Sequence, residues 1–279
     1  MQACMEYNKL LSIEEKQKIS LEILTFFHNY CEKNGLTYYL AYGTLLGAVR
    51  HRGFIPWDDD VDVHIPRHDY DKLLKCFHDP SGRFEIISSS TKNWYVLPFA
   101  KLQDTKTKKI TEDGQINDQY FGIGIDLFPL DGIPDDLEAA NKAFRRKNQE
   151  FLKVLWRLDT YRRIDKASSI TEMIKHLIGS MLFSTGLLSK EAEKLSRSPY
   201  SVDYDEANKL ACVVGIHSGR FCPFDKKWFE KTELRFEGRS FLAPKGYHEI
   251  LSLIYGDYMT PPDENHRFSN HADQYVLID

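Results

Sequence analysis

The chain has 279 residues, with 42% hydrophobic and 28% charged residues and a net charge of −4, values typical of a globular protein of one or two domains. The lack of a basic excess argues against general nucleic-acid binding, which needs a positively charged surface. Five scattered cysteines without a CxxC pair favour reduced thiols and a cytoplasmic protein. No apolar run reaches the roughly 18 residues of a membrane span, and we expect no signal peptide at the start.

The first predicted element is a helix that begins after Ser12 and ends at Gly35. Ser12 and Glu15 form the pattern of a capping box, apolar residues recur at helical spacing, and Gly35 is a typical C-terminal stop. Alternating and helical patterns, separated by turn residues, predict the elements that follow. In chain order these are strand 37–43, helix 45–51, strand 60–65, helix 67–78 and strands 83–90, 94–104, 108–114 and 122–132.

Beyond Pro134 the pattern becomes helical and rich in Lys, Arg and Glu. We therefore predict an α+β protein with a mixed β-sheet flanked by helices and a helical insertion. Its parts are a core over residues 1–134, a helical subdomain over 135–210 and a mixed C-terminal part over 211–279 that packs on the core. The most apolar stretch, "LIGSMLFSTGLL" at 177–188, is expected to form a buried helix, with a segment on a membrane surface as the alternative.

Four aspartates crowd the start of the strand predicted over residues 60–65. Alternate side chains of a strand point to opposite faces, so Asp60 and Asp62 share one face and the apolar residues between them share the other. Two neighbouring carboxylates repel each other, or one has its pKa raised, unless a cation neutralises them. Asp58 lies on the same side if the strand starts early, and Asp59 then points away as a turn residue.

A second predicted strand carries one carboxylate in an apolar setting. In "GIGIDLFPLD" the isoleucines and the first leucine share a face, and Asp126 lies on the other. A lone charge there is costly unless it is paired or binds a metal ion. If the two strands are neighbours, Asp60, Asp62 and Asp126 converge. Ligands that are all oxygen suit Mg²⁺ or Mn²⁺ rather than zinc, and such ions commonly serve phosphoryl transfer.

The stretch "AYGTLLGAVRHRG" supplies groups that suit a phosphate. Gly43 would let a phosphate approach the backbone, Thr44 offers a hydroxyl, and the helix that follows offers unpaired amides at its N-terminus. Arg50 and Arg52 would add charge-assisted contacts to phosphate oxygens. A plain helix cap and surface charges are the alternative, and the position one short element before the aspartates is what favours the phosphate site.

These residues carry a resemblance to a known family. Gly43-Thr44, then Asp60-x-Asp62, then a distant Asp126 is similar to the signature of the nucleotidyltransferase fold. More narrowly, "YGTLLGAVRHRGFIPWDDDVDV" followed by "GIDLFPLDG" resembles the LicD family of phosphotransferases, which are related to the fukutin-type enzymes. The similarity is dense over residues 38–71 and 121–133, looser in "YGDYMTPP", and covers no motif in the helical middle.

The resemblance implies transfer of a phospho-alcohol, typically phosphocholine, from a CDP-linked donor such as CDP-choline, with CMP as the leaving group. The acceptor would be a hydroxyl of a cell-surface glycan, such as a teichoic acid or lipopolysaccharide, or of its lipid-linked precursor. Asp60 and Asp62 match the family's metal-binding pair, Asp126 its third acidic position, and Gly43-Thr44 its phosphate-binding turn. Asp58 also matches an acidic position. The protein would then work in the cytoplasm, at the inner membrane face, with a peripheral membrane contact as an option.

Three other functions remain open from the residues alone. The same fold could transfer a nucleotide monophosphate to a sugar or small molecule, a DxD pair could serve a glycosyltransferase, or the chain could be a non-catalytic glycan-binding or metal-binding module. Weaker site candidates are His64, Lys101, Asp104, Glu233 and Arg267, with Trp57 and Trp94 as walls for a quaternary ammonium group. For Lys101 and Asp104 we expect solvated charges at a strand end, and for His217, His266 and His271 structural roles.

Overall fold

The computed structural model describes residues 9–110, 121–162, 170–171, 174, 177–178, 187–197, 201–212, 221–263, 267 and 273–278. The first helix, α1 (Ile13–Asn34), has both predicted ends. The Glu15 backbone N–H donates to Ser12 Oγ at 3.2 Å, and the Ser12 N–H donates to Glu15 Oε2 at 2.8 Å, so the capping box is confirmed. Gly35 ends the helix at a φ of 61°, a left-handed conformation that favours glycine.

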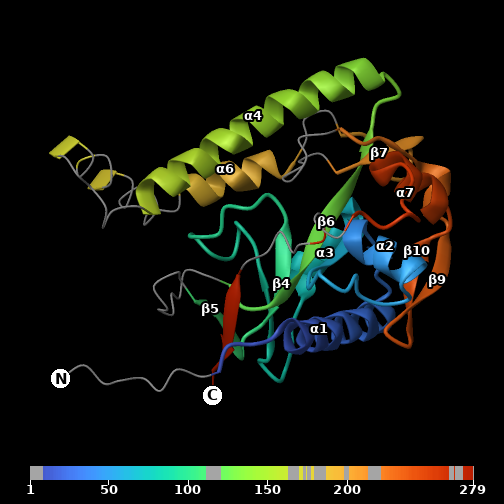
Figure 1. The fold of residues 1–279 in the computed structure, drawn as a ribbon. Helices are drawn as coiled ribbons and strands as arrows, with labels where there is room; N and C mark the ends of the chain where they lie inside the picture. Colours follow the sequence, from blue (N-terminus) through green and yellow to red (C-terminus); the bar gives the residue numbers. More distant parts are fainter. Residues whose placement is uncertain are drawn as a thin grey trace.

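A mixed sheet forms the centre of the molecule (Figure 1). Its strands run in the order β1 (Tyr39–Leu40), β2 (Val61–Pro66), β6 (Gly124–Ile133), β4 (Ala100–Asp104) and β3 (Phe84–Ile87). The β2–β6 pair is parallel and the other pairs are antiparallel. The C-terminal half of β6 continues beyond these partners and pairs with β7 (Lys209–Ala211), which pairs in turn with β8 (Phe224–Asp225).

Helices and small sheets surround this centre. In Figure 1, α1 lies below the sheet, whereas α4 (Leu137–Arg162) and α6 (Leu187–Leu195) lie side by side above it. Helix α2 (Tyr42–Arg50) packs against β2, and α3 (Arg67–Cys76) packs against β2 and β6. The remaining elements are β5 (Thr107–Ile110) paired with β11 (Gln274–Leu277), the 3-10 turn η2 (Lys226–Phe229), the hairpin β9 (Lys231–Phe236) and β10 (Arg239–Pro244), and α7 (Tyr247–Tyr255).

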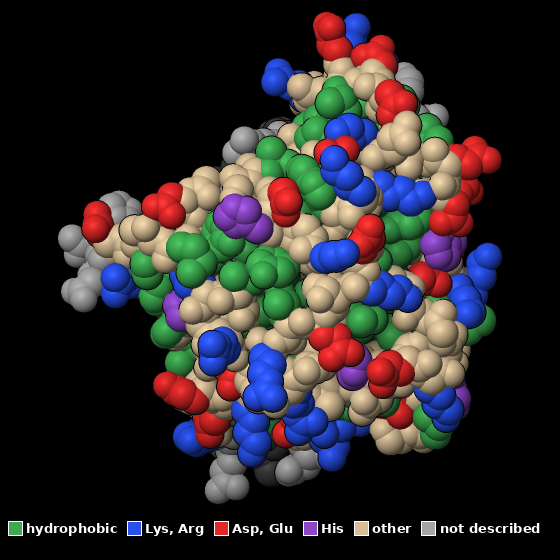
Figure 2. All heavy atoms as spheres, turned by 90° about the vertical axis from the view of Figure 1, so that its right-hand side faces the viewer, with side chains coloured by type: hydrophobic (Ala, Val, Ile, Leu, Met, Phe, Trp, Pro, Cys, Tyr) green, Lys and Arg blue, Asp and Glu red, His purple; other side chains and the backbone are tan. Residues whose placement is uncertain are grey.

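Two hydrophobic clusters stabilise the fold. The larger joins the apolar face of α1 to the sheet, and Ile23, Leu24 and Phe27 are fully buried there. The smaller lies between α4 and α6, where Phe151 and Val154 are also fully buried. Burying each side chain of this size stabilises the folded state by about 1.5–3 kcal/mol. The face with α7 and the β9–β10 hairpin shows acidic and basic side chains intermixed around small hydrophobic areas (Figure 2).

The mixed α+β class is confirmed, but several element bounds differ from those predicted. Strand β4 begins at Ala100 rather than at residue 94, because Pro98 has no N–H to donate to a ladder. Helix α2 begins at Tyr42, which has a φ of 43°, so Gly43 and Thr44 lie in its first turn instead of at the end of a strand. Within the described residues, no helix combines the length and apolar character needed to cross a bilayer.

The apolar segment at 177–188 differs from its prediction where it is described. Most of the segment lies outside the described residues. Leu177 and Ile178 are 72% and 50% exposed, so a fully buried helix is wrong for its start, whereas Leu188 in α6 is 2% exposed. The start of the segment follows α4 at the end of the molecule farthest from α7, beyond the reach of the sheet (Figure 1).

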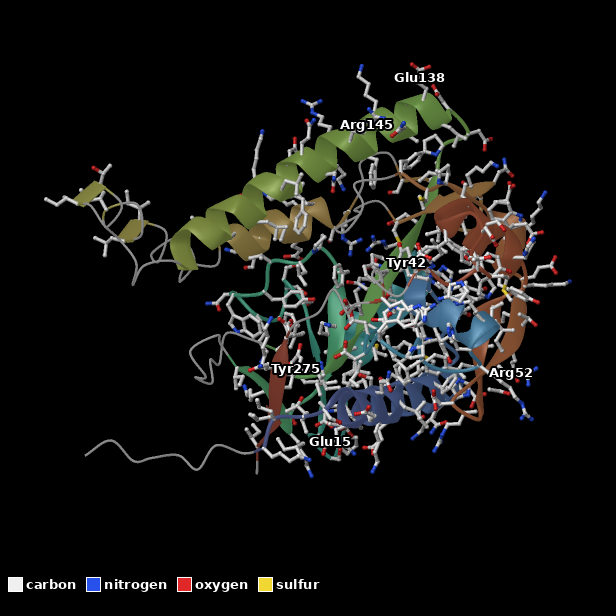
Figure 3. The ribbon with its side chains drawn as sticks, in the orientation of Figure 1. Glu15, Tyr42, Arg52, Glu138, Arg145 and Tyr275 are labelled. Atoms are coloured by element: carbon white, nitrogen blue, oxygen red, sulfur yellow. The ribbon has the colours of Figure 1, made fainter. Side chains whose placement is uncertain are left out.

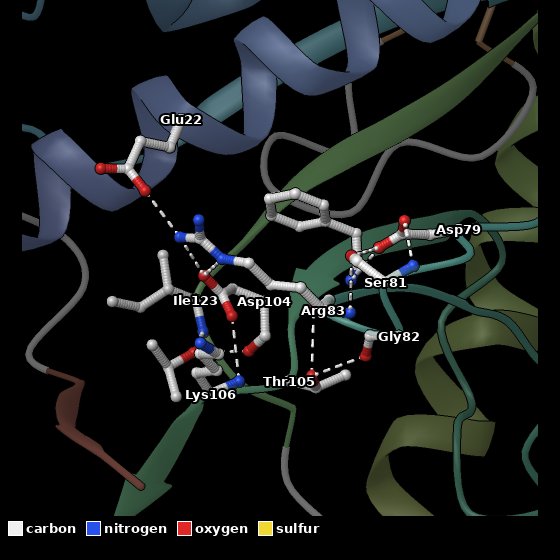
Figure 4. A network of polar contacts seen from close by, with 11 residues as sticks. Glu22, Asp79, Ser81, Gly82, Arg83, Asp104, Thr105, Lys106 and Ile123 are labelled. Carbon is white, nitrogen blue, oxygen red and sulfur yellow. Dashed lines mark hydrogen bonds and ion pairs between the residues drawn. The ribbon is translucent and has the colours of Figure 1, made fainter. Parts of the chain in front are cut away.

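The prediction that Asp104 is a solvated charge is also wrong, because a polar network surrounds it (Figure 4). Asp104 is 1% exposed. It accepts hydrogen bonds from Arg83 Nε at 2.9 Å and from the Lys106 N–H at 2.9 Å. Arg83 also contacts Glu22 of α1 at 2.6 Å. One arginine therefore ties α1 to the β3–β4 pair, and the two carboxylates differ in burial.

Asp104→Ala should lower the free energy of unfolding by about 1–3 kcal/mol, because it leaves two donors without their buried acceptor. Glu22→Ala is the matched control, since it removes the other carboxylate bound by the same arginine, and its side chain is 44% exposed. That variant should lose less than about 1 kcal/mol. Urea unfolding of both variants measures the difference. Equal losses would show that the burial of Asp104 does not matter.

Candidate active site

Three charged side chains lie in one row across three neighbouring strands. In the parallel pair β2–β6, Asp62 is in register with Asp126. In the antiparallel pair β4–β6, Lys101 is in register with the same Asp126. Residues in register project to the same face of a sheet, so the two predicted carboxylates converge as expected, and a lysine joins them. The neighbouring strands that the sequence argument required are therefore present.

The lysine and the central aspartate form an ion pair. Lys101 Nζ lies 2.5 Å from Asp126 Oδ1, and the two side chains are 11% and 17% exposed. Burial acts to lower the pKa of Lys101, but the carboxylates of Asp126, Asp60 and Asp62 outweigh it, and the pKa is raised. Lys101 is therefore a fixed positive charge in the site, and the prediction of a solvated charge at a strand end is wrong for it.

Lys101 does not offset the effects of burial and of the other carboxylates on Asp62. Burial raises the pKa of Asp62 well above its usual value, and Asp126, Asp60 and Asp58 raise it further, whereas Lys101 acts in the opposite direction. The aspartates at positions 58, 60, 62 and 126 thus act on one another electrostatically. A second cation would relieve the repulsion.

Asp58 and Asp59 have different surroundings. A Cβ placed on Gly43 would lie 3.0 Å from Asp58 Oδ2, so any larger residue in this turn of α2 would press on the carboxylate and shift it by a few tenths of an ångström. Asp59 points instead to α1, where it is 7% exposed and forms an ion pair with Lys16. The prediction that Asp59 faces away from the other aspartates agrees with this pairing, but its interpretation as a turn residue is wrong.

Thr44 connects α2 to the strand with the aspartates. The Asp62 N–H donates to Thr44 Oγ1 at 2.8 Å, and Thr44 is 3% exposed. This bond explains in part why a Gly-Thr pair and a DxD pair occur together in the sequence. The hydroxyl still has its own proton to donate, so the predicted contact with a phosphate stays compatible with this geometry.

Arg50 and Arg267 hold the C-terminal loop beside the aspartate motif. Arg50 Nη1 donates to the Tyr258 carbonyl at 2.7 Å. Arg267 donates from Nε to the Pro262 carbonyl at 2.8 Å, and its Cζ lies 5.5 Å from the centre of the Trp57 ring. The loop after α7 therefore lies against the start of the motif. The phosphate-binding role predicted for Arg50 stays a prediction, with this structural contact beside it.

Tyrosines around the carboxylates were not predicted from the sequence. Tyr42, at the start of α2, and Tyr275, on β11, come from opposite sides of the site (Figure 3). Burial raises the pKa of both phenols, and nearby carboxylates add to the effect: Asp62 for Tyr42, and Asp60 and Asp126 among others for Tyr275. Both groups are neutral near pH 7. These phenols therefore add no charge near the aspartates, and the Tyr42 side chain forms a hydrogen bond with Cys212.

The other residues that the sequence offered as site candidates have different surroundings in the structure. His64 is 2% exposed and packs against Tyr42 at 4.8 Å between ring centres, and burial lowers its pKa to about 3. It is a neutral core residue. Glu233 is exposed on β9, and Trp94 packs against Tyr95 at 6.1 Å. The histidines at positions 217, 266 and 271 lie outside the described residues.

The carboxylates match a hard divalent cation in their chemistry. All of their ligand atoms are oxygens, and they outnumber the positive charge that Lys101 supplies. As placed here, no three His, Cys, Asp or Glu side chains in the described part of the chain form a group that would hold a metal ion. The fit to Mg²⁺ therefore depends on the donor type and on the repulsion that the neighbouring carboxylates exert on Asp62.

The sequence of this chain is similar to a family model and to known proteins. Residues 35–156 match the family model described as LicD/FKTN/FKRP, nucleotidyltransferase domain. This range contains Gly43, Thr44, Arg50 and the aspartates at positions 58, 60, 62 and 126, but not the weaker candidates Glu233 and Arg267. The lipopolysaccharide cholinephosphotransferase LicD of Haemophilus influenzae is 28% identical over 276 residues, which cover 96% of this chain and 100% of that protein. An uncharacterized protein of Rickettsia typhi is 45% identical over 130 residues, 44% of this chain and 41% of its own. Another, of Rickettsia prowazekii, is 43% identical over 65 residues, 23% and 24% of the two chains.

Lys101→Met should reduce stability in a way that depends on pH. The folded-state pKa of Asp62 is raised above 3.8, so its ionisation opposes folding as the pH rises from about that value. Without the ammonium this penalty grows. We expect a loss of about 3–5 kcal/mol at pH 8, the range for breaking a buried ion pair, and a much smaller loss near pH 4. Thermal unfolding at both pH values measures it.

Lys92→Met is the control for that variant. Lys92 forms an ion pair of similar length with Glu85, at 2.7 Å, but the two side chains are 34% and 39% exposed. Its removal should cost less than about 1 kcal/mol at either pH. A Lys101 variant whose loss is the same at both pH values would contradict the electrostatic account.

Thr44→Val should leave the Asp62 N–H without an acceptor and cost about 1–3 kcal/mol. Thr44→Ser keeps the hydroxyl and should recover most of that stability. Chemical denaturation of the two variants gives the comparison. If serine and valine were equally destabilising, the methyl packing of Thr44 rather than its hydrogen bond would hold α2 against β2.

Proposed function

We propose that this chain, whose residues 35–156 form a LicD-family domain, transfers a phospho-alcohol from a CDP-linked donor to a hydroxyl of a glycan, with phosphocholine as the first choice. The chain is a transferase: its similarity to a cholinephosphotransferase covers 96% of its residues and the whole of that relative. The acceptor that we favour is a lipopolysaccharide or its lipid-linked precursor, because lipopolysaccharide is in the relative's name. A teichoic acid is the alternative.

The row of Asp62, Asp126 and Lys101 is the observation that carries this proposal. A diphosphate donor brings negative charge toward carboxylates, so a site for it needs positive charge at the same place. Lys101 supplies one such charge from the sheet itself. The amides in the first turn of α2 and the Thr44 hydroxyl lie next to Asp62 and are suited to phosphate oxygens.

A divalent cation, Mg²⁺ or Mn²⁺, would be held by Asp60, Asp62 and Asp126, with Asp58 as a possible fourth ligand. When bound, it would neutralise negative charge on the diphosphate and on the leaving CMP. Lys101 and Thr44 would orient the donor. In the reaction the acceptor oxygen forms a bond to the phosphorus that carries the alcohol, and the bond from that phosphorus to the CMP oxygen breaks. The proton of the acceptor hydroxyl passes to a carboxylate of the site, and Asp126 would either take this proton or share the metal ion.

Nucleotidyl transfer is the second candidate, because the matched family model is described as a nucleotidyltransferase domain. The products distinguish the two reactions. Incubation with Mg²⁺ and a panel of CDP-alcohols, nucleoside triphosphates and nucleotide-sugars, each with a lipopolysaccharide acceptor, should give CMP from a CDP-alcohol. Pyrophosphate from a triphosphate would support nucleotidyl transfer, and nucleoside diphosphate from a sugar donor would support glycosyl transfer. No turnover of any donor would favour a binding module.

Asp62→Asn should abolish activity without unfolding the protein. The substitution removes a charge that the folded state holds at a cost, so the melting temperature should stay the same or rise. CMP release should fall by about 10²-fold or more, the scale expected for a group that acts on the reacting atoms. Chromatography of CMP and a thermal scan give the two measurements.

Asp59→Asn is the control, since it changes the same residue type three positions earlier. Asp59 pairs with Lys16 on the other side of the strand, so this variant should melt at a lower temperature and keep the turnover of its folded fraction. Near-normal CMP release by the Asp62 variant would show that Asp62 does not face the reacting groups. Loss of CMP release in the Asp59 variant alone would show that the two residues were assigned to the wrong faces of the strand.

A further inference from the structure

An exposed apolar stripe follows the end of α4. Ile170, Ile174, Leu177 and Ile178 are helical, and their exposed fractions are 74%, 50%, 72% and 50%. In Figure 1 these helical pieces lie beyond the end of α4, away from the sheet and from the candidate active site. The four residues, called the apolar stripe below, are among the most exposed large hydrophobic side chains of the described chain.

The spacing of the stripe places its members on one face of a helix. The positions 170, 174, 177 and 178 follow the i, i+4, i+7, i+8 pattern of an amphipathic helix. The sequence between them is polar at Thr171, Glu172, Lys175 and His176. A helix with this pattern in a globular protein covers a core or a partner.

The core between α4 and α6 does not need the stripe. Phe151 and Val154 of α4 are fully buried, as are Ala192 and, nearly so, Leu188 of α6. These two helices therefore already bury their apolar faces against each other. The stripe is an additional apolar surface, and it is found where the chain passes from one helix to the other.

The charge of the same region indicates which partner fits. Residues 137–197 contain thirteen Lys and Arg but seven Asp and Glu, in a chain whose net charge is −4. The rest of the chain is thus strongly acidic, and the helical region is basic. Exposed members include Lys142, Arg145, Arg146, Lys190 and Lys194, and Figure 3 places Arg145 on α4. Lys190 and Lys194 follow the stripe in the sequence, whereas Lys142, Arg145 and Arg146 lie in the first turns of α4. An exposed apolar stripe in a basic helical region is typical of segments that lie in the interface of an anionic membrane.

We propose that the apolar stripe docks this protein on an anionic lipid surface. The stripe would enter the boundary between head groups and acyl chains, and the basic residues of α4 and α6 would contact lipid phosphates. This contact does not depend on which group the enzyme transfers. It would hold the active site near acceptors that are themselves anchored in a membrane.

Sedimentation of the full chain with lipid vesicles, without any donor, tests the proposal. We expect binding to vesicles of phosphatidylcholine mixed with phosphatidylglycerol, weak binding to phosphatidylcholine alone, and weaker binding as salt rises. The double variant Ile170→Asp, Leu177→Asp should bind about tenfold more weakly or worse, because each change removes an apolar side chain from the lipid and adds a negative charge.

The matched control adds the same two charges elsewhere. Leu10→Asp with Leu277→Asp changes leucines that are 47% and 48% exposed, one paired with β11 and one at its end, and should bind within about twofold of wild type. Hydrogen exchange of the unchanged protein supplies a second measurement, and exchange in peptides over 170–178 should slow when anionic vesicles are added.

Several outcomes would overturn the proposal. These are no binding by wild type, equal binding to neutral and anionic vesicles, unchanged binding by the stripe variant, or exchange over 170–178 that vesicles do not slow. Size-exclusion chromatography covers the main alternative. If wild type is a dimer and the stripe variant a monomer, a second copy of this chain covers the stripe instead of lipid. Because no donor is present, a failed transferase assay has no bearing on these results.

Discussion

The register between β2, β6 and β4 is the constraint on which the site depends. It aligns Asp62, Asp126 and Lys101, so that two carboxylates and one ammonium group share a partly buried face. A slip of one residue in either pair would turn one of these charges toward the hydrophobic core. The apolar residues that alternate with them, such as Val61, Val63 and Ile125, are almost fully buried and fix that register. The same alternation that builds the core therefore also gathers the charges.

Other features of the motif follow from that register. Thr44 binds the backbone of Asp62, and so α2 begins beside the strand that carries the aspartates. Gly43 leaves room for Asp58, whose carboxylate lies close to it. Asp59 cannot join its neighbours and instead pairs with Lys16 of α1, which fastens the longest helix of the core to the same strand. The aspartates of this short run therefore differ in their effect. Asp58, Asp60 and Asp62 bring negative charge together in the site, whereas Asp59 holds the strand against α1.

Periodicity was enough to predict the first half of this arrangement. Alternation separated Asp60 and Asp62 from the core face, and a capping box and a glycine stop predicted the ends of α1. Lys101 was misjudged, although the same rule would have found it: Ala100 and Leu102 alternate with it and are fully buried, which leaves the lysine on the aspartate side. Tyr275 could not be predicted, because its position depends on β11 pairing with β5 across more than 160 residues of chain, and no local pattern encodes that contact.

The site is costly for the fold, and the surrounding structure compensates for it. Asp62 is held where its ionisation is disfavoured, and a single lysine offsets only part of the repulsion. A fold under selection for stability alone would replace one of these carboxylates by an amide or an apolar group. Retention of the full set, next to a glycine and a threonine at a helix start, is what a site would need if it is to attract a cation and a diphosphate together. The raised pKa of Asp62 is therefore a cost to the fold, and this cost favours a role for the carboxylates in binding rather than in stability.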